Sequence, residues 1–203
     1  MDKRIKKQAQ SNVSITSIAT KVKKTTNLRR LYDRLRGGHV LRYHTRPEIA
    51  DGQNVAAHTW RAMVILQTLF PDISKNGLLH MMYHDVAEAE TGDIPATTKW
   101  KYNDLSHLML RIETEYEQKI GIGPTIINVS QQEQEMCDIA DKLELVFHCY
   151  RLMQQGNSRA EDVFIKGCNY IQDRYEKQDH YAHVIEIIKD LQGTRKIKLE
   201  KLF

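Results

Sequence analysis

The sequence predicts an all-α protein. Apolar residues recur at steps of three and four along much of the chain, as on the buried face of a helix, and strand-like alternation is nowhere sustained. The 203 residues include only ten glycines and four prolines, which are too few for the many tight turns of an all-β fold. Hydrophobic residues form 41% of the chain, which is enough for a real core, so wholesale disorder is not expected.

The N-terminus is expected to be a loosely ordered basic arm over residues 1–12, followed by a single helical domain over residues 13–203. Residues 1–30 carry nine Lys and Arg side chains against the single acid Asp2, within a net charge of +4 for the whole chain. Such a stretch is either a solvated arm or a surface that steers polyanions. No aromatic residue lies among these charges, so stacking of nucleic-acid bases is not supported there.

The predicted helices are set off by helix-breaking residues and polar stretches. Gly37 and Gly38 end the first, Pro71 follows the second, and Gly92 follows the third, where a left-handed glycine is common. The longest has apolar residues at steps of three and four over residues 136–150. The predicted helices cover residues 14–35, 55–71, 75–90, 104–120, 131–155, 159–175 and 179–192, with a polar loop over residues 42–47.

Cysteine usage and the absence of long apolar runs bear on the compartment. Cys137, Cys149 and Cys168 are an odd number with no CxxC pair, which fits reduced thiols better than a disulfide framework. The N-terminus lacks the apolar run of a signal peptide. No stretch approaches the ~20 apolar residues that a membrane span needs. We therefore expect a cytoplasmic protein that does not enter a membrane.

Four short motifs occur in one order along the chain. They are Gln53 to His58, the pair His84-Asp85, Thr91 to Pro95, and Ile139 to Asp141. Two histidines and two aspartates at these separations can supply three imidazole or carboxylate corners of a divalent-metal site, with positions left open for water and substrate. A single His-Asp pair is common by chance, but all four motifs on or beside predicted helices indicate metal-assisted hydrolysis.

Helical geometry turns several motif residues toward one interior. His58 lies on the apolar line of its helix, and Asp85 lies on the apolar line of the next. A carboxylate that faces inward is costly to bury unless it is paired, hydrogen-bonded or bound to a metal. Asp141 lies at the edge of its apolar stripe, and Glu88 lies on the same side as Asp85, one turn on. Three helices can thus deliver ligands to one point inside a bundle.

Each of these residues also has a purely structural interpretation. An inward histidine such as His58 is more often a hydrogen-bonded core residue than a ligand. Asp141 beside Lys142 is usual for a solvated helix face, and Glu88 can be a surface acid. We expect His148 to be structural.

The motif set resembles the HD-domain metal-dependent phosphohydrolases. The stretch from His84 to Glu88, followed by Thr91 to Pro95, is similar to the small 5′-deoxynucleotidase branch of that superfamily. The stretch from Arg42 to Thr45, followed by Gln53 to Trp60, resembles phage-type deoxynucleoside triphosphate hydrolases, including those specific for dATP. The likeness covers roughly residues 35–175 and implies an HD-domain-like helical bundle with a metal site in its core.

The resemblance also implies roles for individual residues. The metal ligands would be His58, His84, Asp85 and Asp141. Glu88 and Asp93 would be the acid and base that handle the attacking water and the leaving group, in an order that the sequence leaves open. Arg42, Tyr43 and Lys99 would bind the substrate. Relatives often have Trp where this chain has Tyr43, which bears on substrate preference more than on catalysis.

The implied activity is metal-dependent hydrolysis of a 2′-deoxynucleotide. The leading prediction is a dNTP, possibly dATP, triphosphohydrolase that yields the deoxynucleoside plus triphosphate or phosphates. A 5′-deoxynucleotidase that releases phosphate from dNMPs is the alternative, and cyclic nucleotides are a third substrate class. A non-catalytic module that binds nucleic acid or a partner protein is the alternative outside enzymes.

The donor set and composition also suggest a cofactor and partners. Two histidines and two aspartates suit Co, Mn, Zn, Fe or Ni better than Mg alone, and a second divalent ion could accompany a phosphate tail. The chain has no P-loop, so a nucleotide would be held through the metal and basic side chains. We expect a small-molecule deoxynucleotide substrate and a homo-oligomer with Trp60, Trp100 or helix 131–155 at its contacts, and do not expect nucleic acid as a partner.

Overall fold

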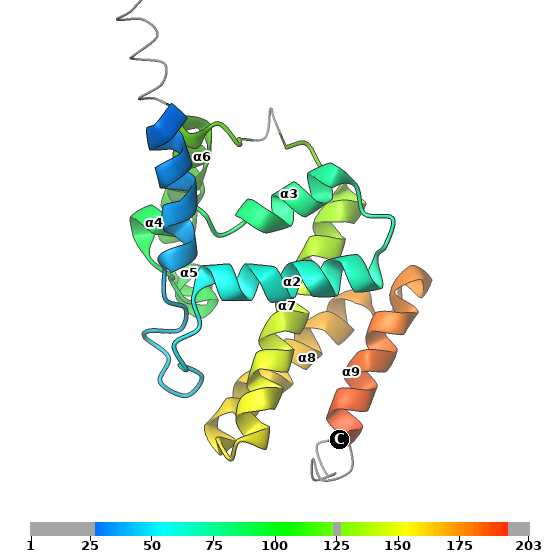
Figure 1. Cartoon of the computed structure of the whole chain (residues 1–203). Helices are drawn as coiled ribbons and strands as arrows, with labels where there is room; N and C mark the ends of the chain where they lie inside the picture. Colours follow the sequence, from blue (N-terminus) through cyan, green and yellow to red (C-terminus); the bar gives the residue numbers. More distant parts are fainter. Residues whose placement is uncertain (1–26, 124–126, 195–203) are drawn as a thin grey trace, which may run out of the picture.

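The computed structural model describes residues 27–123 and 127–194, and these residues form an all-α fold (Figure 1). Their one departure from helices, turns and loops is an isolated antiparallel bridge between Leu41 and Asn54. The predicted fold class is therefore confirmed. No helix in the described ranges is both long and apolar enough to cross a membrane.

The helices follow one another with short connections. Residues 27–36 are helical and lead directly into the first 3-10 turn. The elements after them are η1 (Gly37–His39), α2 (Val55–Leu69), α3 (Lys75–Tyr83), α4 (Glu88–Thr91), α5 (Ala96–Lys101), α6 (Asn103–Ile120), α7 (Gln131–Gln154), η2 (Ser158–Ala160), α8 (Glu161–Tyr175), η3 (Asp179–Tyr181) and α9 (Ala182–Thr194).

Most predicted helices agree with these bounds to within a few residues. The first predicted helix is seen from residue 27 onward, whereas its earlier part and the predicted arm lie outside the described residues. Two predictions differ from the structure. The single helix expected over residues 75–90 is wrong, because α3 and α4 are separate. Helix α5 was not expected, since its six residues carry no apolar period.

The break between α3 and α4 has a local cause at His84. Nδ1 of His84 donates a hydrogen bond to the backbone carbonyl of Met81, at 2.7 Å. In a continuing helix this carbonyl would accept from the backbone N–H of Asp85. The chain instead turns, and the N–H of Glu88 reaches the carbonyl of Asp85 at 3.1 Å. His84 and Asp85 therefore sit in a turn, not on one helical face.

The ends of α2 and α7 are set by side-chain caps. Asn54 accepts from the N–H of Ala57 at 2.9 Å and starts α2, so His58 lies in the first turn of that helix. Ser130 and Glu133 form a reciprocal capping box at the start of α7. These caps position the two helices that carry His58 and Asp141.

The main core lies where α2 crosses α7, with α8 packed along α7 and α9 packed against α8 (Figure 1). Its largest groups are fully buried, and they come from distant parts of the chain. They include Leu66 from α2, Ile139 and Leu143 from α7, Phe164 and Ile171 from α8, and Ile188 from α9.

A second, smaller apolar cluster anchors the turn that carries His84 and Asp85. Val86 and Ala87, which follow directly, are buried against Tyr116 and Ile120. The turn is thereby held on its far side by α6, while its histidine and aspartate face the main core.

Gly167 allows α8 to approach α7 closely, and Gly167→Ala is expected to destabilise the protein. A Cβ atom there would lie 2.8 Å from Cγ2 of Val146, a fully buried and stiff side chain. We expect a loss of about 1–2 kcal/mol in the free energy of unfolding, measured by urea denaturation. Gly193→Ala in α9 is the control, because a Cβ there meets nothing within 4 Å. Equal stabilities of the two variants would contradict the prediction.

Candidate metal centre and active site

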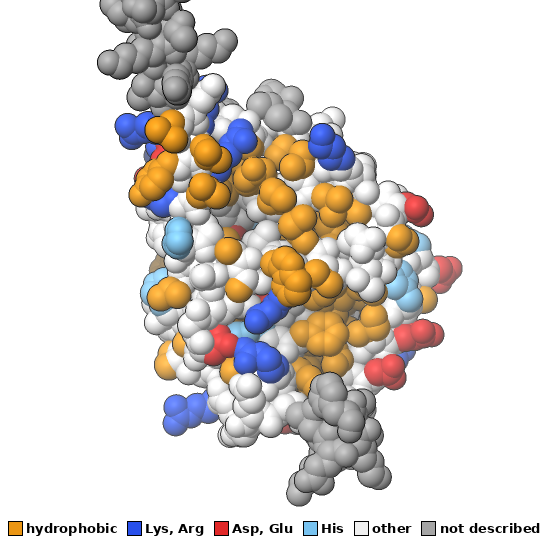
Figure 2. Space-filling view, in the orientation of Figure 1, with side chains coloured by type: hydrophobic (Ala, Val, Ile, Leu, Met, Phe, Trp, Pro, Cys, Tyr) orange, Lys and Arg blue, Asp and Glu red, His pale blue; other side chains and the backbone are white. Residues whose placement is uncertain are grey.

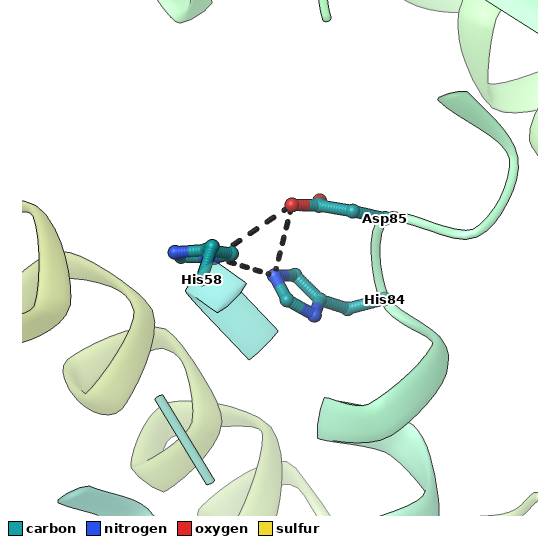
Figure 3. A group of neighbouring side chains, drawn as sticks. All are labelled: His58, His84 and Asp85. Carbon is teal, nitrogen blue, oxygen red and sulfur yellow. Dashed lines mark hydrogen bonds and ion pairs between the residues drawn. The ribbon is translucent and has the colours of Figure 1, made fainter. Parts of the chain in front are cut away.

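His58 is completely buried in the first turn of α2, and it faces inward as the sequence predicted. Its Nδ1 donates to Oε2 of Glu144 at 2.7 Å. Its Nε2 points the other way, toward His84 and Asp85 from the turn after α3 (Figure 3). The ring thus has one nitrogen committed to a carboxylate and the other directed into a cluster of potential ligands.

The structure brings together the four residues that the sequence singled out as metal ligands. The donor atoms of His58, His84 and Asp85 all lie within 4.8 Å of one another, and Asp141 joins them from α7. The separations are His58 Nε2 to Asp141 Oδ1 3.1 Å, His58 Nε2 to His84 Nε2 3.2 Å, His84 Nε2 to Asp85 Oδ2 3.2 Å, His58 Nε2 to Asp85 Oδ2 3.7 Å and His84 Nε2 to Asp141 Oδ1 3.8 Å.

This arrangement fits a divalent transition metal. Bonds of about 2.0–2.2 Å place adjacent ligand atoms about 2.8–3.6 Å apart in tetrahedral or octahedral sites, close to the separations seen. Nδ1 of His84 donates its proton in a hydrogen bond to the Met81 carbonyl, so Nε2 is the nitrogen that can bind an ion. Imidazole and carboxylate together are a donor set that Zn, Mn, Co, Fe and Ni accept.

Charges in the cluster balance one another in the absence of an ion. Burial alone would lower the pKa of His84, but the negative charges of Asp85 and Asp141 raise it to about 10. Burial would raise the pKa of Asp85, but the positive charges of His84 and Arg42 outweigh it and hold the pKa well below its usual range. A cation at this point would take over the role of the imidazolium proton.

Arg42 is held beside the cluster by two groups. Its Nη1 lies 2.5 Å from Oδ2 of Asp85, and its Nη2 donates to the hydroxyl of Tyr43 at 3.1 Å. Burial would lower the pKa of Arg42, but the charges of its neighbours, including Asp85, raise that pKa above its ordinary value. Arg42 therefore remains a cation. Its Nε is buried without a hydrogen-bond partner among the described residues.

Tyr43 has a backbone conformation that is rare for a bulky side chain. Its φ of 58° lies in the left-handed region. The backbone N–H of Tyr43 donates to the carboxylate of Asp93, and its ring lies 5.3 Å from the ring of His148. The turn therefore links two loops at the mouth of the site. His148 is buried and its Nε2 bonds the carbonyl of Ile49, as expected for a structural residue.

Glu88 and Asp93, the two candidate acid and base residues, have different surroundings. Burial, together with the negative charges of Asp85 and Asp93, raises the pKa of Glu88 to about 9. Oε2 of Glu88 is buried and has no hydrogen-bond partner in the described part of the chain. These surroundings favour the protonated form of Glu88, and they are not those of the surface acid in the alternative interpretation. Asp93 instead accepts a backbone N–H.

A cavity of about 270 Å³ opens over this cluster. Asp85, Asp141 and Glu88 are among its polar lining, and its apolar walls come from the 94–97 segment, α7 and α8. The basic residues in its lining are Arg42, Arg46, Lys99, Lys142 and Lys166. Lys99, a predicted substrate-binding residue, lines the same cavity as Arg42 and Tyr43. Its Nζ lies 3.8 Å from Oε1 of Glu113.

Two residues at this site were missed by the sequence analysis. Glu144 lies three residues after Asp141 on α7, and that spacing on one helix face is a signal that could have identified it. Lys142 lines the cavity with its Nζ 2.5 Å from Oδ2 of Asp141. The alternative that Asp141 and Lys142 form an ordinary solvated helix face is therefore wrong.

Comparison with known proteins gives one family match. Residues 40–190 match the profile of the family described as 5′-deoxynucleotidase YfbR-like. No curated protein matches the chain.

Several solved structures have a similar fold. The PH0347 protein from Pyrococcus horikoshii OT3 is 18% identical, with a TM-score of 0.62 over 81% of this chain and 99% of its own. The cyanophage S-2L HD phosphohydrolase DatZ, bound to dA and one catalytic Zn²⁺ ion, is 21% identical, with a TM-score of 0.61 over 81% of this chain and 95% of its own. A conserved hypothetical protein from Pyrococcus furiosus is 16% identical, with a TM-score of 0.60 over 82% and 99%.

The protonated state of Glu88 predicts a pH-dependent stability of the metal-free protein. The folded pKa of about 9 exceeds the ordinary value of about 4.3, so the folded state holds an extra proton between these values. The stabilisation is fully present below about pH 4.3 and is lost as the pH rises toward 9. Glu88→Gln should remove this contribution, which has a slope of up to about 1.4 kcal/mol per pH unit.

The measurement is urea denaturation in the presence of chelator at a series of pH values. Glu115→Gln is the control, because the Glu115 side chain is 72% exposed on α6, and it should follow the wild type. Identical pH dependence in the wild type and Glu88→Gln would show that Glu88 is ionised in the folded protein.

Proposed function

Because the chain belongs to the YfbR-like 5′-deoxynucleotidase family, we propose that it cleaves the 5′ phosphoester bond of a 2′-deoxynucleotide. Membership makes it an enzyme, a metal-dependent phosphohydrolase of the HD superfamily that acts on deoxynucleotides. The observation that carries the proposal is the convergence of His58, His84, Asp85 and Asp141 below a cavity lined by basic side chains.

In the proposed mechanism these four residues hold one divalent ion. When bound, such an ion supplies a water nucleophile at neutral pH and neutralises negative charge on the phosphoryl group. Arg42 lies against Asp85, so its guanidinium can donate to phosphoryl oxygens next to the ion. Lys99 lines the same cavity from α5 and adds a second positive charge.

The different surroundings of Glu88 and Asp93 support an assignment of acid and base. The raised pKa of Glu88 suits a proton donor, so Glu88 would give a proton to the departing 5′ oxygen. Asp93, fixed by the N–H of Tyr43, would orient the attacking water and take its proton. Two carboxyl groups in different environments are a common basis for such a division.

The length of the phosphate chain has two candidates. Arg46, Lys142 and Lys166 line the cavity in addition to Arg42 and Lys99, and this excess of basic side chains favours a triphosphate, whose tail could bring a second divalent ion. The family description favours a monophosphate. The proposal of adenine as the base rests on the resemblance to phage-type enzymes. The dA bound by DatZ also carries adenine.

Three further features are part of the proposal. The ion is Co, Mn, Zn, Fe or Ni, in keeping with the mixed nitrogen and oxygen donors. The protein is a homo-oligomer, supported by the 67% exposed Trp60 beside exposed Val64 on α2, while the side chain of Trp100 is outside the described residues. It acts in the cytoplasm, since its three cysteines are unpaired.

A product assay tests the proposed activity and decides between the two substrates. The protein with Co²⁺ or Mn²⁺ is incubated with dNMPs, dNTPs and their ribonucleotide counterparts, and products are resolved by anion-exchange chromatography. We expect deoxynucleosides from 2′-deoxynucleotides and no turnover in excess chelator. Direct conversion of a dNTP to its deoxynucleoside identifies a triphosphohydrolase, and conversion of dNMPs alone identifies the monophosphatase. No hydrolysis of any deoxynucleotide would contradict the proposal.

Asp85→Ala is expected to abolish hydrolysis while the helices remain. The change removes one oxygen ligand and the partner of Arg42, so we expect turnover to fall by about 10³-fold or more. Hydrolysis is followed with saturating metal, and far-UV circular dichroism checks the fold. Asp104→Ala in the first turn of α6 is the control and should keep full activity. Retained turnover in Asp85→Ala would rule out the ligand assignment.

A further inference from the structure

Glu144 is a buried carboxylate on the side of His58 that faces away from the proposed ion. Its side chain is 2% exposed, and its Oε2 accepts from His58 Nδ1 at 2.7 Å. The ordinary cost of burying such a charge is several kcal/mol unless its oxygens are fully partnered. The partners of both Glu144 oxygens therefore decide whether this carboxylate is stable beside His58.

The second oxygen of Glu144 is held by two residues. Gln53, in the segment before α2, donates from Nε2 to Oε1 at 2.7 Å, and Nη1 of Arg61 lies 3.5 Å from the same oxygen. Together with the contact to His58, these contacts give both oxygens of the buried carboxylate a partner.

Arg61 connects this buried network to the protein surface. It lies three residues after His58 on α2, and its side chain is 42% exposed. It lines a groove of about 320 Å³ between α2 and α7, in which Trp60 and Phe147 are also exposed. Figure 2 shows basic side chains beside hydrophobic ones on this face. Arg151 lines the same groove but pairs with Asp51 instead.

The two sides of His58 compete for its proton. Asp141 and Asp85 lie 3.1 and 3.7 Å from Nε2 and would favour a proton on that nitrogen. A proton there would block metal binding, because an ion needs the free lone pair of Nε2. Glu144 draws the proton to Nδ1, which leaves Nε2 free and fixes the plane of the ring.

We propose that Glu144, Gln53 and Arg61 form a positioning network that sets the tautomer of His58 and thereby the metal affinity of the site. The network reaches the surface at Arg61, so a residue that contacts neither ion nor substrate adjusts the affinity for metal. This inference rests on the proposed function, because it takes His58 as a metal ligand.

The test measures metal affinity directly. Co²⁺ and Zn²⁺ are titrated into the metal-free protein in competition with a chromophoric chelator. Glu144→Gln keeps the size of the side chain and should weaken binding by about 10–100-fold. Arg61→Met should weaken it in the same direction by a smaller factor, and Arg61→Lys should restore part of the loss. The control Arg151→Met removes the same charge from the same groove, but its partner is Asp51 and not Glu144, so it should bind metal as the wild type does.

A second readout separates positioning from a general loss of structure. ¹⁵N NMR of the metal-free protein reports which nitrogen of His58 carries the proton, and far-UV circular dichroism reports the fold. We expect the Nδ1–H form in the wild type and a shift toward Nε2–H in Arg61→Met. If Glu144→Gln does not fold, the metal titration and the ¹⁵N NMR of the two Arg61 variants test the proposed network.

The outcomes distinguish this inference from the proposed function. A wild type that binds no metal would overturn both. A wild type that binds metal, with folded Glu144→Gln and Arg61→Met variants of equal affinity and unchanged tautomer, would overturn the network alone. Equal losses in Arg61→Met and Arg151→Met would also overturn it, because the effect would then belong to the groove in general.

Discussion

The need to partner buried charge governs the centre of this protein. Asp85, Asp141 and Glu144 bring three carboxylates to the crossing of α2 and α7, where a lone charge would be unstable. Each carboxylate meets a positive or hydrogen-bonding partner, and His58 contacts all three. Arg42 pairs with Asp85, Lys142 pairs with Asp141, and Arg61 pairs with Glu144. Cations therefore surround the cluster. The charge pairing that allows these carboxylates to be buried also creates a site suited to a divalent ion.

The positions of these charges depend on two apolar clusters. The main core fixes α2 and α7, which carry His58 and Asp141. The smaller cluster fixes the turn after α3 through Val86 and Ala87. His84 and Asp85 therefore face a site whose other half is held by different residues. A helix that continued through His84 would carry Asp85 and Glu88 at helical spacing and would not present them as this turn does, which makes the break part of the architecture of the site.

Chemically similar groups at this site have different environments, and these differences support different roles. Glu88 and Asp93 are both carboxyl groups beside one cavity, but Glu88 is desolvated near other negative charges and Asp93 is bound by a backbone N–H. Likewise His58 and His84 each commit Nδ1 to an acceptor, a carboxylate in one case and a backbone carbonyl in the other. Both leave Nε2 to the cluster. These choices of partner, more than the residue types, support the roles proposed for them.

The sequence by itself determined the helical class, most helix bounds and the residues with metal-binding chemistry. These follow from local rules: apolar spacing, caps such as Ser130, and the ligand chemistry of His and Asp. The tertiary structure decided what depends on contacts between distant segments. His58 meets Glu144 across 86 residues of sequence, and no local pattern reports that contact. The break at His84 was missed because a single side-chain hydrogen bond to Met81, together with packing against α6, outweighs a good helical pattern. Periodicity tells which face of a helix is buried, but only packing determines which charges share that buried space and which of them keep their protons.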